Sequence, residues 1–119
     1  MEKKLFDSEL KVMEVLWNRG DTPARQIAAI LTEEVGWNVN TTYTLIKRCI
    51  NKGAIERREP GFLCVPLVTK EAVQEAETDE LVNKLFDGSA DMLFASLLGK
   101  KKLSAAQIDR LRELVKEME

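Results

Sequence analysis

The amino-acid sequence predicts a mostly α-helical protein that contains one small β-hairpin. Three observations support this: apolar residues recur at helical spacing along most of the chain, residues that cap helices precede these stretches, and one strand–turn–strand pattern lies in the middle. The chain has 119 residues, of which 45% are hydrophobic. It is therefore long enough for one domain, or one domain with an appendage, and apolar enough for a real core.

Two helices are predicted in the first third of the chain. Asp7 is expected to cap a helix that ends near Asn18, and its apolar stripe is wide enough to be covered on more than one side. Thr22 is expected to cap a second helix with Pro23 at its first position. This second helix is expected to end near Gly36.

A third helix over residues 39–51 is predicted to have two chemically different sides. Asn38 is a suitable N-cap, and Gly53 is a suitable left-handed residue after the end. The side expected to face the core carries Thr42, Leu45, Ile46 and Cys49. The opposite side and its flanks carry Asn40, Thr41, Tyr43, Thr44, Lys47, Arg48 and Asn51.

A β-hairpin is predicted directly after this helix, with strands over 54–59 and 62–65 joined by a turn at Pro60 and Gly61. It carries the paired cations Arg57 and Arg58. Amides, hydroxyls and cations on one helix face, next to a basic hairpin, suit DNA base edges and phosphates. An ordinary solvated helix face beside an ordinary hairpin is the alternative that these residues leave open.

The negative net charge of the chain weakens the DNA-binding interpretation without excluding it. The net charge is −2, but residues 1–70 hold 11 Lys/Arg against 9 Asp/Glu, whereas residues 71–119 hold 7 against 11. Local field rather than total charge steers a protein onto DNA. The N-terminal part, which contains the third helix, is the more positive one.

Three further helices are predicted after the hairpin. Thr69 caps a long one, Ser89 caps a short one, and Ser104 with Gln107 forms a capping box for the last. Three such helices are too short and too apolar to bury their own surface, so an identical chain is the simplest partner, with packing onto residues 1–70 as the alternative. The expected dimer interface comprises Leu81, Leu85, Phe86, Phe94, Leu97, Leu98, Ile108, Leu111, Val115 and Met118.

Composition argues against several other functions. The chain has no histidine and no CxxC pair, which excludes histidine-dependent catalysis and argues against a metal site. The sequence also has no glycine-rich phosphate-binding loop. We therefore expect that the protein is not an enzyme and binds no cofactor. Cys49 and Cys64 lie on apolar faces and are expected to be reduced. No apolar run approaches a membrane span or a signal peptide, so we expect a cytoplasmic protein without a membrane partner.

The order and spacing of several motifs resemble the penicillinase-repressor family, the BlaI/MecI/CopY regulators. The motifs are Leu10-Lys11-Val12-Met13-Glu14-Val15-Leu16-Trp17, then Trp37 with Thr41, Thr44, Leu45 and Arg48, then Lys52-Gly53-Ala54-Ile55, Phe86-Asp87-Gly88-Ser89 and Leu103-Ser104. The resemblance covers essentially the whole chain. It implies a winged helix-turn-helix DNA-binding domain over 1–70 and a C-terminal helical dimerisation region over 71–119. It also implies repression of transcription at a palindromic operator.

The resemblance assigns roles to individual residues of the third helix and the wing. The residues that it places in the DNA groove are Asn40, Thr41, Tyr43 and Thr44. The residues that it assigns to phosphates or guanine edges are Lys47, Arg48 and the wing residues Arg57 and Arg58.

This chain departs from the family pattern in three places. The strand after Gly61 is shorter and more apolar than the usual basic and aromatic wing strand. The CxC…CxC tail of copper-responsive members is missing, so we expect no copper sensing by that route. Antibiotic-responsive members are cut by a protease at an Asn-Phe bond in the fifth helix. The aligned pair here is Ser96-Leu97, which is the candidate site for a regulatory protease.

The sequence therefore predicts a homodimeric, sequence-specific, DNA-binding transcriptional repressor without catalytic activity. Its third helix and wing would bind a palindromic double-stranded DNA operator. The alternative is a winged-helix protein–protein adaptor without specific DNA binding, in which Asn40 to Arg48 contact protein.

Overall fold

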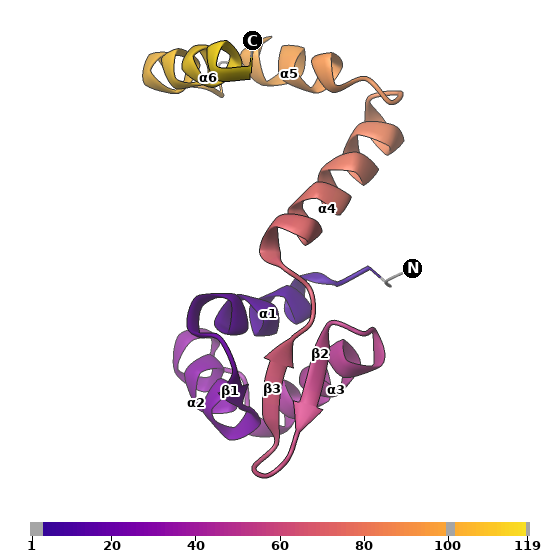
Figure 1. Ribbon diagram of the computed structural model, residues 1–119, viewed down its shortest axis with the longest axis vertical. Coiled ribbons are helices and arrows are strands. Elements are labelled where there is room, and N and C mark those ends of the chain that lie inside the picture. The colour runs from indigo at the N-terminus through magenta and orange to yellow at the C-terminus, as the bar shows by residue number, and fades with distance from the viewer. Residues whose placement is uncertain (1–3, 100–101, 119) are drawn as a thin grey trace. The chain divides into compact units, whose positions relative to one another are not determined.

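The computed structural model describes residues 4–99 and 102–118. Within them the elements follow the order α1 (Asp7–Arg19), β1 (Thr22–Pro23), α2 (Ala24–Val35), α3 (Val39–Asn51), β2 (Ile55–Arg58), β3 (Leu63–Pro66), α4 (Lys70–Leu85), α5 (Ala90–Gly99) and α6 (Ala105–Met118) (Figure 1). The fold class predicted from the sequence, mostly helical with a small β-hairpin, is confirmed. The chain packs as two units, Met1–Val73 and Gln74–Glu119, so the boundary falls inside α4.

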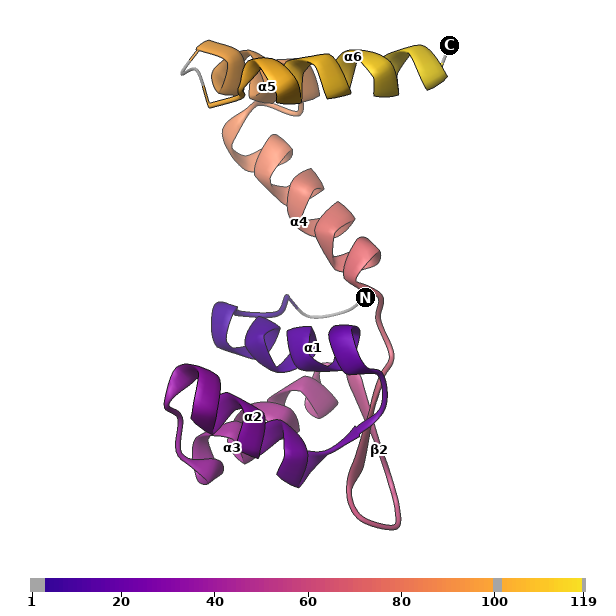
Figure 2. The ribbon, with the colours of Figure 1, turned by 90° about the vertical axis from the view of Figure 1, so that its left-hand side faces the viewer.

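The first unit has its core between α1, α2, α3 and the sheet. Its largest fully buried side chains include Met13 and Leu16 of α1, Ile27 and Leu31 of α2, Ile46 of α3 and Ile55 of β2. The three helices lie on one side of the β2–β3 hairpin, whose tip extends past them (Figure 2). The hairpin with its turn, residues 55–66, is called the wing below.

The sheet contains a strand that the sequence did not predict. Its order is β1-β3-β2, and Thr22 and Pro23 of β1 pair with Cys64 and Leu63 of β3. The prediction that Thr22 caps α2 was wrong, because Thr22 is buried in β1 and its hydroxyl donates to the Gly20 carbonyl at 2.8 Å. Pro23 takes the N-cap position instead. A two-residue edge strand tolerates proline, which lacks an N–H, so the same residues fit both assignments.

The start of α1 also differs from the prediction by one residue. Phe6, not Asp7, is the N-cap, and a phenylalanine side chain cannot accept a hydrogen bond. The Glu9 carboxylate compensates by accepting the Phe6 N–H at 2.7 Å. This is the glutamate half of a capping box.

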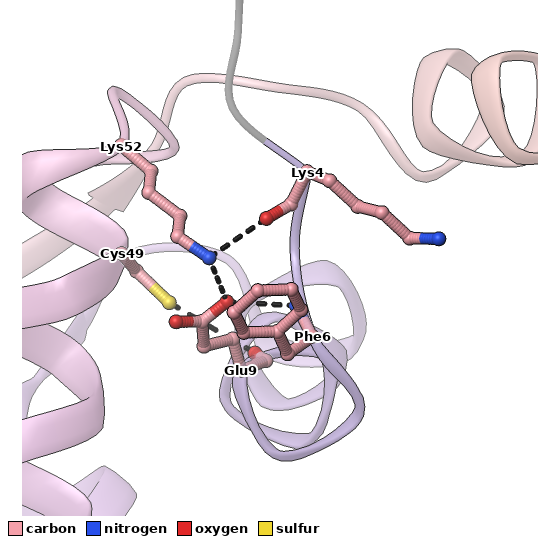
Figure 3. Close-up of polar contacts among 5 residues, drawn as sticks. All are labelled: Lys4, Phe6, Glu9, Cys49 and Lys52. Carbon is pink, nitrogen blue, oxygen red and sulfur yellow. Dashed lines mark hydrogen bonds and ion pairs between the residues drawn. The ribbon is translucent and has the colours of Figure 1, made fainter.

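Glu9 additionally forms a buried ion pair with Lys52, just after the end of α3 (Figure 3). Their side chains are 1% and 14% exposed, and Glu9 Oε1 lies 2.6 Å from Lys52 Nζ. The ammonium group also donates to the Lys4 carbonyl at 2.7 Å and lies 3.9 Å from the centre of the Phe6 ring. These contacts tie the C-terminal end of α3 to α1 and to the segment that precedes it.

The predicted boundaries of α3 and the wing are close to those observed. Asn38 Oδ1 accepts the Thr41 N–H at 2.8 Å, and Gly53 adopts a φ of 80° after the end of α3, so both cap predictions are confirmed. The turn of the wing spans residues 59–62 and begins with a cis peptide bond between Glu59 and Pro60. Gly61 and Phe62 both have positive φ, at 84° and 52°.

The helices α4, α5 and α6 begin at the predicted caps. Thr69 Oγ1 accepts the Ala72 N–H at 3.0 Å, and Ser89 Oγ accepts the Met92 N–H at 3.4 Å. Ser104 and Gln107 exchange hydrogen bonds of 2.8 and 3.1 Å, which confirms the capping box. None of the helices within residues 4–99 and 102–118 combines the length and hydrophobicity needed to cross a lipid bilayer.

Candidate nucleic-acid interface and apolar surface

Five polar side chains form a continuous exposed strip along α3. The core side of the helix buries Leu45, Ile46 and Cys49 together with the hydroxyl-bearing Thr42, and this burial turns the opposite side to solvent. The exposed strip, called the polar face of α3 below, consists of Asn40, Thr41, Thr44, Lys47 and Arg48. All five were predicted as site residues, and the structure places them together on the exposed side of α3.

A groove of about 400 Å³ runs between the polar face of α3 and the first turn of α1. Ser8 forms the α1 wall, and Trp37 and Asn38 close the end near the start of α3. Sequence reasoning did not assign Ser8 to the site. No local pattern places a serine in the first turn of α1 beside a helix that begins about thirty residues later, so tertiary packing alone creates this neighbourhood.

Tyr43 has a different environment from the polar face. It is half-buried, and its ring meets the Phe62 ring edge-on at a centroid distance of 5.8 Å and an angle of 77°. Edge-to-face aromatic pairs of this kind are stabilising. Tyr43 therefore joins α3 to the wing, and its ring is committed to packing rather than freely exposed.

Arg57 continues this contact chain onto the wing. Its guanidinium lies 3.7 Å from the centre of the Phe62 ring, a cation–π arrangement. Its Nε donates to Glu59, whose other oxygen accepts the Phe62 N–H at 3.2 Å. The hydrogen bonds from Arg57 and from the Phe62 backbone hold the pKa of Glu59 below its usual range.

Arg58 lies on the other face of β2. Neighbouring residues of a strand point to opposite faces, and the register pairs Arg57 with Cys64 but Arg58 with Leu63. Arg58 forms hydrogen bonds of 3.0 and 3.2 Å with Glu56. The two wing arginines that the sequence grouped together are therefore separated by the strand, and each is paired with a carboxylate two residues away.

The two cysteines lie in the core of the first unit and are free thiols. Burial raises the pKa of Cys49 to about 12, with the negative charge of Glu9 adding to the effect. Burial likewise raises the pKa of Cys64 to about 11. Thiols with such values stay protonated at neutral pH and are poor nucleophiles and metal ligands. The described part of the chain also holds no cluster of three or more potential metal ligands.

The second unit presents an apolar surface to solvent. Neither α5 nor α6 contains a buried residue. Of the predicted interface residues, six are exposed in the single chain: Leu81, Leu85, Phe94, Leu98, Val115 and Met118. The other four are half-buried: Phe86, Leu97, Ile108 and Leu111. Apolar side chains exposed in this number within one unit make it a candidate interaction surface.

Part of this surface is a groove of about 540 Å³ between α5 and α6. It is lined by Phe94 and Leu98 of α5 and by Ile108, Leu111, Leu114, Val115 and Met118 of α6, together with the α6 cations Arg112 and Lys116. Leu114 was not in the predicted interface. The predicted residues of α4 and its end, Leu81, Leu85 and Phe86, are not part of the groove lining. The candidate cleavage pair lies within α5, where Ser96 is exposed and Leu97 is half-buried.

Solved structures identify the fold of the first unit as a winged helix. The solution structure of the DNA-binding domain of the repressor BlaI is similar with a TM-score of 0.54 and 28% identity, covering 59% of this chain and 90% of that one. The solution structure of monomeric Bacillus licheniformis BlaI in complex with the blaP half-operator gives a TM-score of 0.53 at 26% identity, covering 60% and 89%.

Sequence comparison extends the similarity over nearly the whole chain. The penicillinase repressor family profile matches residues 5–117, so the chain belongs to this family of transcriptional repressors. The penicillinase repressor of Bacillus licheniformis is 24% identical over 116 residues, which cover 96% of this chain and 91% of that protein. The methicillin resistance regulatory protein MecI of Staphylococcus aureus (strain N315) is 26% identical over 120 residues, covering 97% and 98%. The predicted family is thus confirmed.

Proposed function

We propose that this protein is a homodimeric transcriptional repressor that acts in the cytoplasm and binds a palindromic DNA operator through α3 and the wing. The observation that carries the proposal is the polar face of α3, which is exposed along its length in a chain of the penicillinase repressor family. The similarity of the first unit to the structure of BlaI in complex with a half-operator supports DNA as the partner of this chain.

The chemistry of the polar face divides its residues between bases and phosphates. Asn40, Thr41 and Thr44 carry the amide and hydroxyl groups that form hydrogen bonds with base edges in the major groove. Lys47 and Arg48 carry the charges that neutralise phosphates beside the groove.

The two wing arginines contribute unequally in this proposal. Arg57 is on the strand face that Phe62 and Tyr43 connect to α3, so it extends the phosphate-binding surface directly. Arg58 lies on the other strand face and acts through longer-range attraction. Tyr43 supports Phe62 at the boundary between helix and wing.

The apolar surface of the second unit fits a second copy of the chain. A two-fold dimer buries the same patch on both partners, which removes the exposed leucine, phenylalanine and methionine side chains from water at once. Residues 1–70 of each protomer would then bind one half-site. Residues 71–119 would form the dimer contact that holds the two DNA-binding domains together. Two linked half-sites bind far more tightly than either alone.

The location of Ser96 and Leu97 suggests how such a repressor could leave DNA. Both lie in α5, which lines one side of the apolar groove through Phe94 and Leu98. A regulatory protease that cut this bond would detach α6 from the rest of the chain and so weaken the dimer. Loss of the dimer would then lower operator affinity.

The proposal is tested by recovering fragmented genomic DNA from the source organism with the purified protein and sequencing it. Enrichment of one palindrome, with an affinity that falls steeply with salt, is the expected result. If Lys47, Arg48 and Arg57 of both protomers each neutralise one phosphate, the slope of log affinity against log salt is about −5. Binding without sequence enrichment and with a shallow slope would instead support the protein–protein adaptor.

A further inference from the structure

The turn of the wing contains a small anion-binding site. The N–H of Phe62 and the Nε of Arg57 both donate to the Glu59 carboxylate, and the Gly61 amide contributes to lowering the pKa of the same group. Gly61 and Phe62 are consecutive residues with positive φ, at 84° and 52°. The backbone N–H groups of successive residues in a turn can form a concavity in which an anion binds.

The occupant of this site is the chain's own carboxylate. We propose that Glu59 is a stand-in for a DNA phosphate, which replaces it on Arg57 and on the turn amides when the protein binds DNA. Glu59 therefore competes with DNA for the wing and lowers its affinity for phosphate backbone. This inference rests on the proposed function, and it adds a residue that acts against DNA binding.

The exposure of the pair makes such an exchange feasible. The side chains of Arg57 and Glu59 are 47% and 59% exposed, and ion pairs as exposed as this contribute little to stability. A phosphate oxygen accepts charge-assisted hydrogen bonds from the same donors.

The site persists when the carboxylate leaves, because Phe62 holds the arginine independently. The guanidinium stays stacked on the Phe62 ring at 3.7 Å, and Tyr43 of α3 packs against that ring at 5.8 Å. The anion site is thus connected to α3 through Tyr43, next to the polar face of that helix.

The first test compares Glu59→Gln with the wild-type full-length protein on a short random-sequence duplex. Glutamine keeps an oxygen that accepts the Phe62 N–H but carries no charge, so the turn is retained while the competition is removed. We expect affinity at low salt to rise at least about threefold, because the phosphate no longer has to displace a carboxylate from Arg57. The salt slope should stay near the wild-type value of about −5, because Arg57 neutralises the same phosphate in both proteins. Unchanged or weaker binding by Glu59→Gln would overturn the proposal.

The matched control is Glu56→Gln, which makes the same change of charge in the same strand. Glu56 pairs with Arg58 on the opposite face of the wing, at 3.0 Å. A rise of equal size in both variants would mean that net charge alone is responsible, and would also overturn the proposal. In the double variant Arg57→Gln/Glu59→Gln the gain should disappear, because the guanidinium that binds the phosphate is gone.

A second measurement tests the anion site without DNA. Inorganic phosphate is titrated into isotope-labelled full-length protein while the amide resonances of Gly61 and Phe62 are followed. In Glu59→Gln both should shift and saturate, whereas in the wild type the carboxylate should suppress the shift. Absence of a shift in the variant would refute the site. If the wild type binds no DNA in a salt-dependent way, the proposed function fails, and the titration still decides the anion site.

Discussion

Replacing Lys52 with methionine would break the buried ion pair that ties α3 to α1. Methionine is of similar length, so the apolar stem remains while the ammonium group is removed. Glu9 is 1% exposed, and its Oε1 would keep only the Phe6 N–H as a donor among the contacts described. Its Oε2 already lacks a hydrogen-bond partner in the described part of the chain. The variant therefore leaves a buried carboxylate with one neutral donor.

The expected cost is large for a domain of this size. Removing one partner of a buried ion pair destabilises a protein by about 3–5 kcal/mol, because the remaining charge is buried without compensation. The contacts of Lys52 with the Lys4 carbonyl and the Phe6 ring are lost at the same time. With roughly 4–8 °C per kcal/mol for small domains, the melting temperature should fall by about 12 °C or more.

A matched exposed pair provides the control. Lys70 Nζ lies 2.9 Å from Glu14 Oε1, but the two side chains are 42% and 43% exposed. Lys70→Met should therefore cost at most about 1 kcal/mol. Urea and thermal unfolding of the full chain, followed by circular dichroism, measure both variants. Equal effects of Lys52→Met and Lys70→Met, or a loss below about 1 kcal/mol for Lys52→Met, would refute the reasoning from burial.

Three further predictions concern DNA binding, dimerisation and release. Thr44→Ala should weaken operator binding by about 1–3 kcal/mol per half-site in gel shifts while random DNA is bound as before, whereas Arg48→Ala should weaken both. Wild-type affinity in these two variants would mean that α3 has another role. Leu111→Asp places a charge in the apolar groove, so sedimentation should show monomers and operator affinity should fall; a dimer of normal stability would contradict the proposed interface. Limited proteolysis should cut first between Ser96 and Lys102, because α5 is only ten residues long, begins just after Gly88 and ends at Gly99, and the cut protein should lose the operator; a first cut elsewhere would count against this release mechanism.

Signals within a few residues of one another were sufficient for most of the helices. Two of the cap contacts join residues three positions apart: Asn38 with the amide of Thr41, and Ser104 with Gln107. Both partners of each contact can therefore be recognised within a short stretch of the sequence. The polar face of α3 is equally local, because helical period alone separates Asn40, Thr44 and Lys47 from the core side. The strand period of two would also have placed Arg57 and Arg58 on opposite faces, although the sequence analysis grouped them.

The sequence by itself thus determined the helices, the wing and the side chains that α3 exposes. Only the tertiary structure decided which distant residues meet: Glu9 with Lys52 across 43 positions, β1 with β3, and Ser8 with the polar face of α3. The tertiary structure also produced the series of contacts that runs from Tyr43 through Phe62 and Arg57 to Glu59. The physical reason is that helix caps and helical periodicity depend on interactions between residues that are close in sequence. Burial and charge pairing depend instead on which distant segments the packed core brings together.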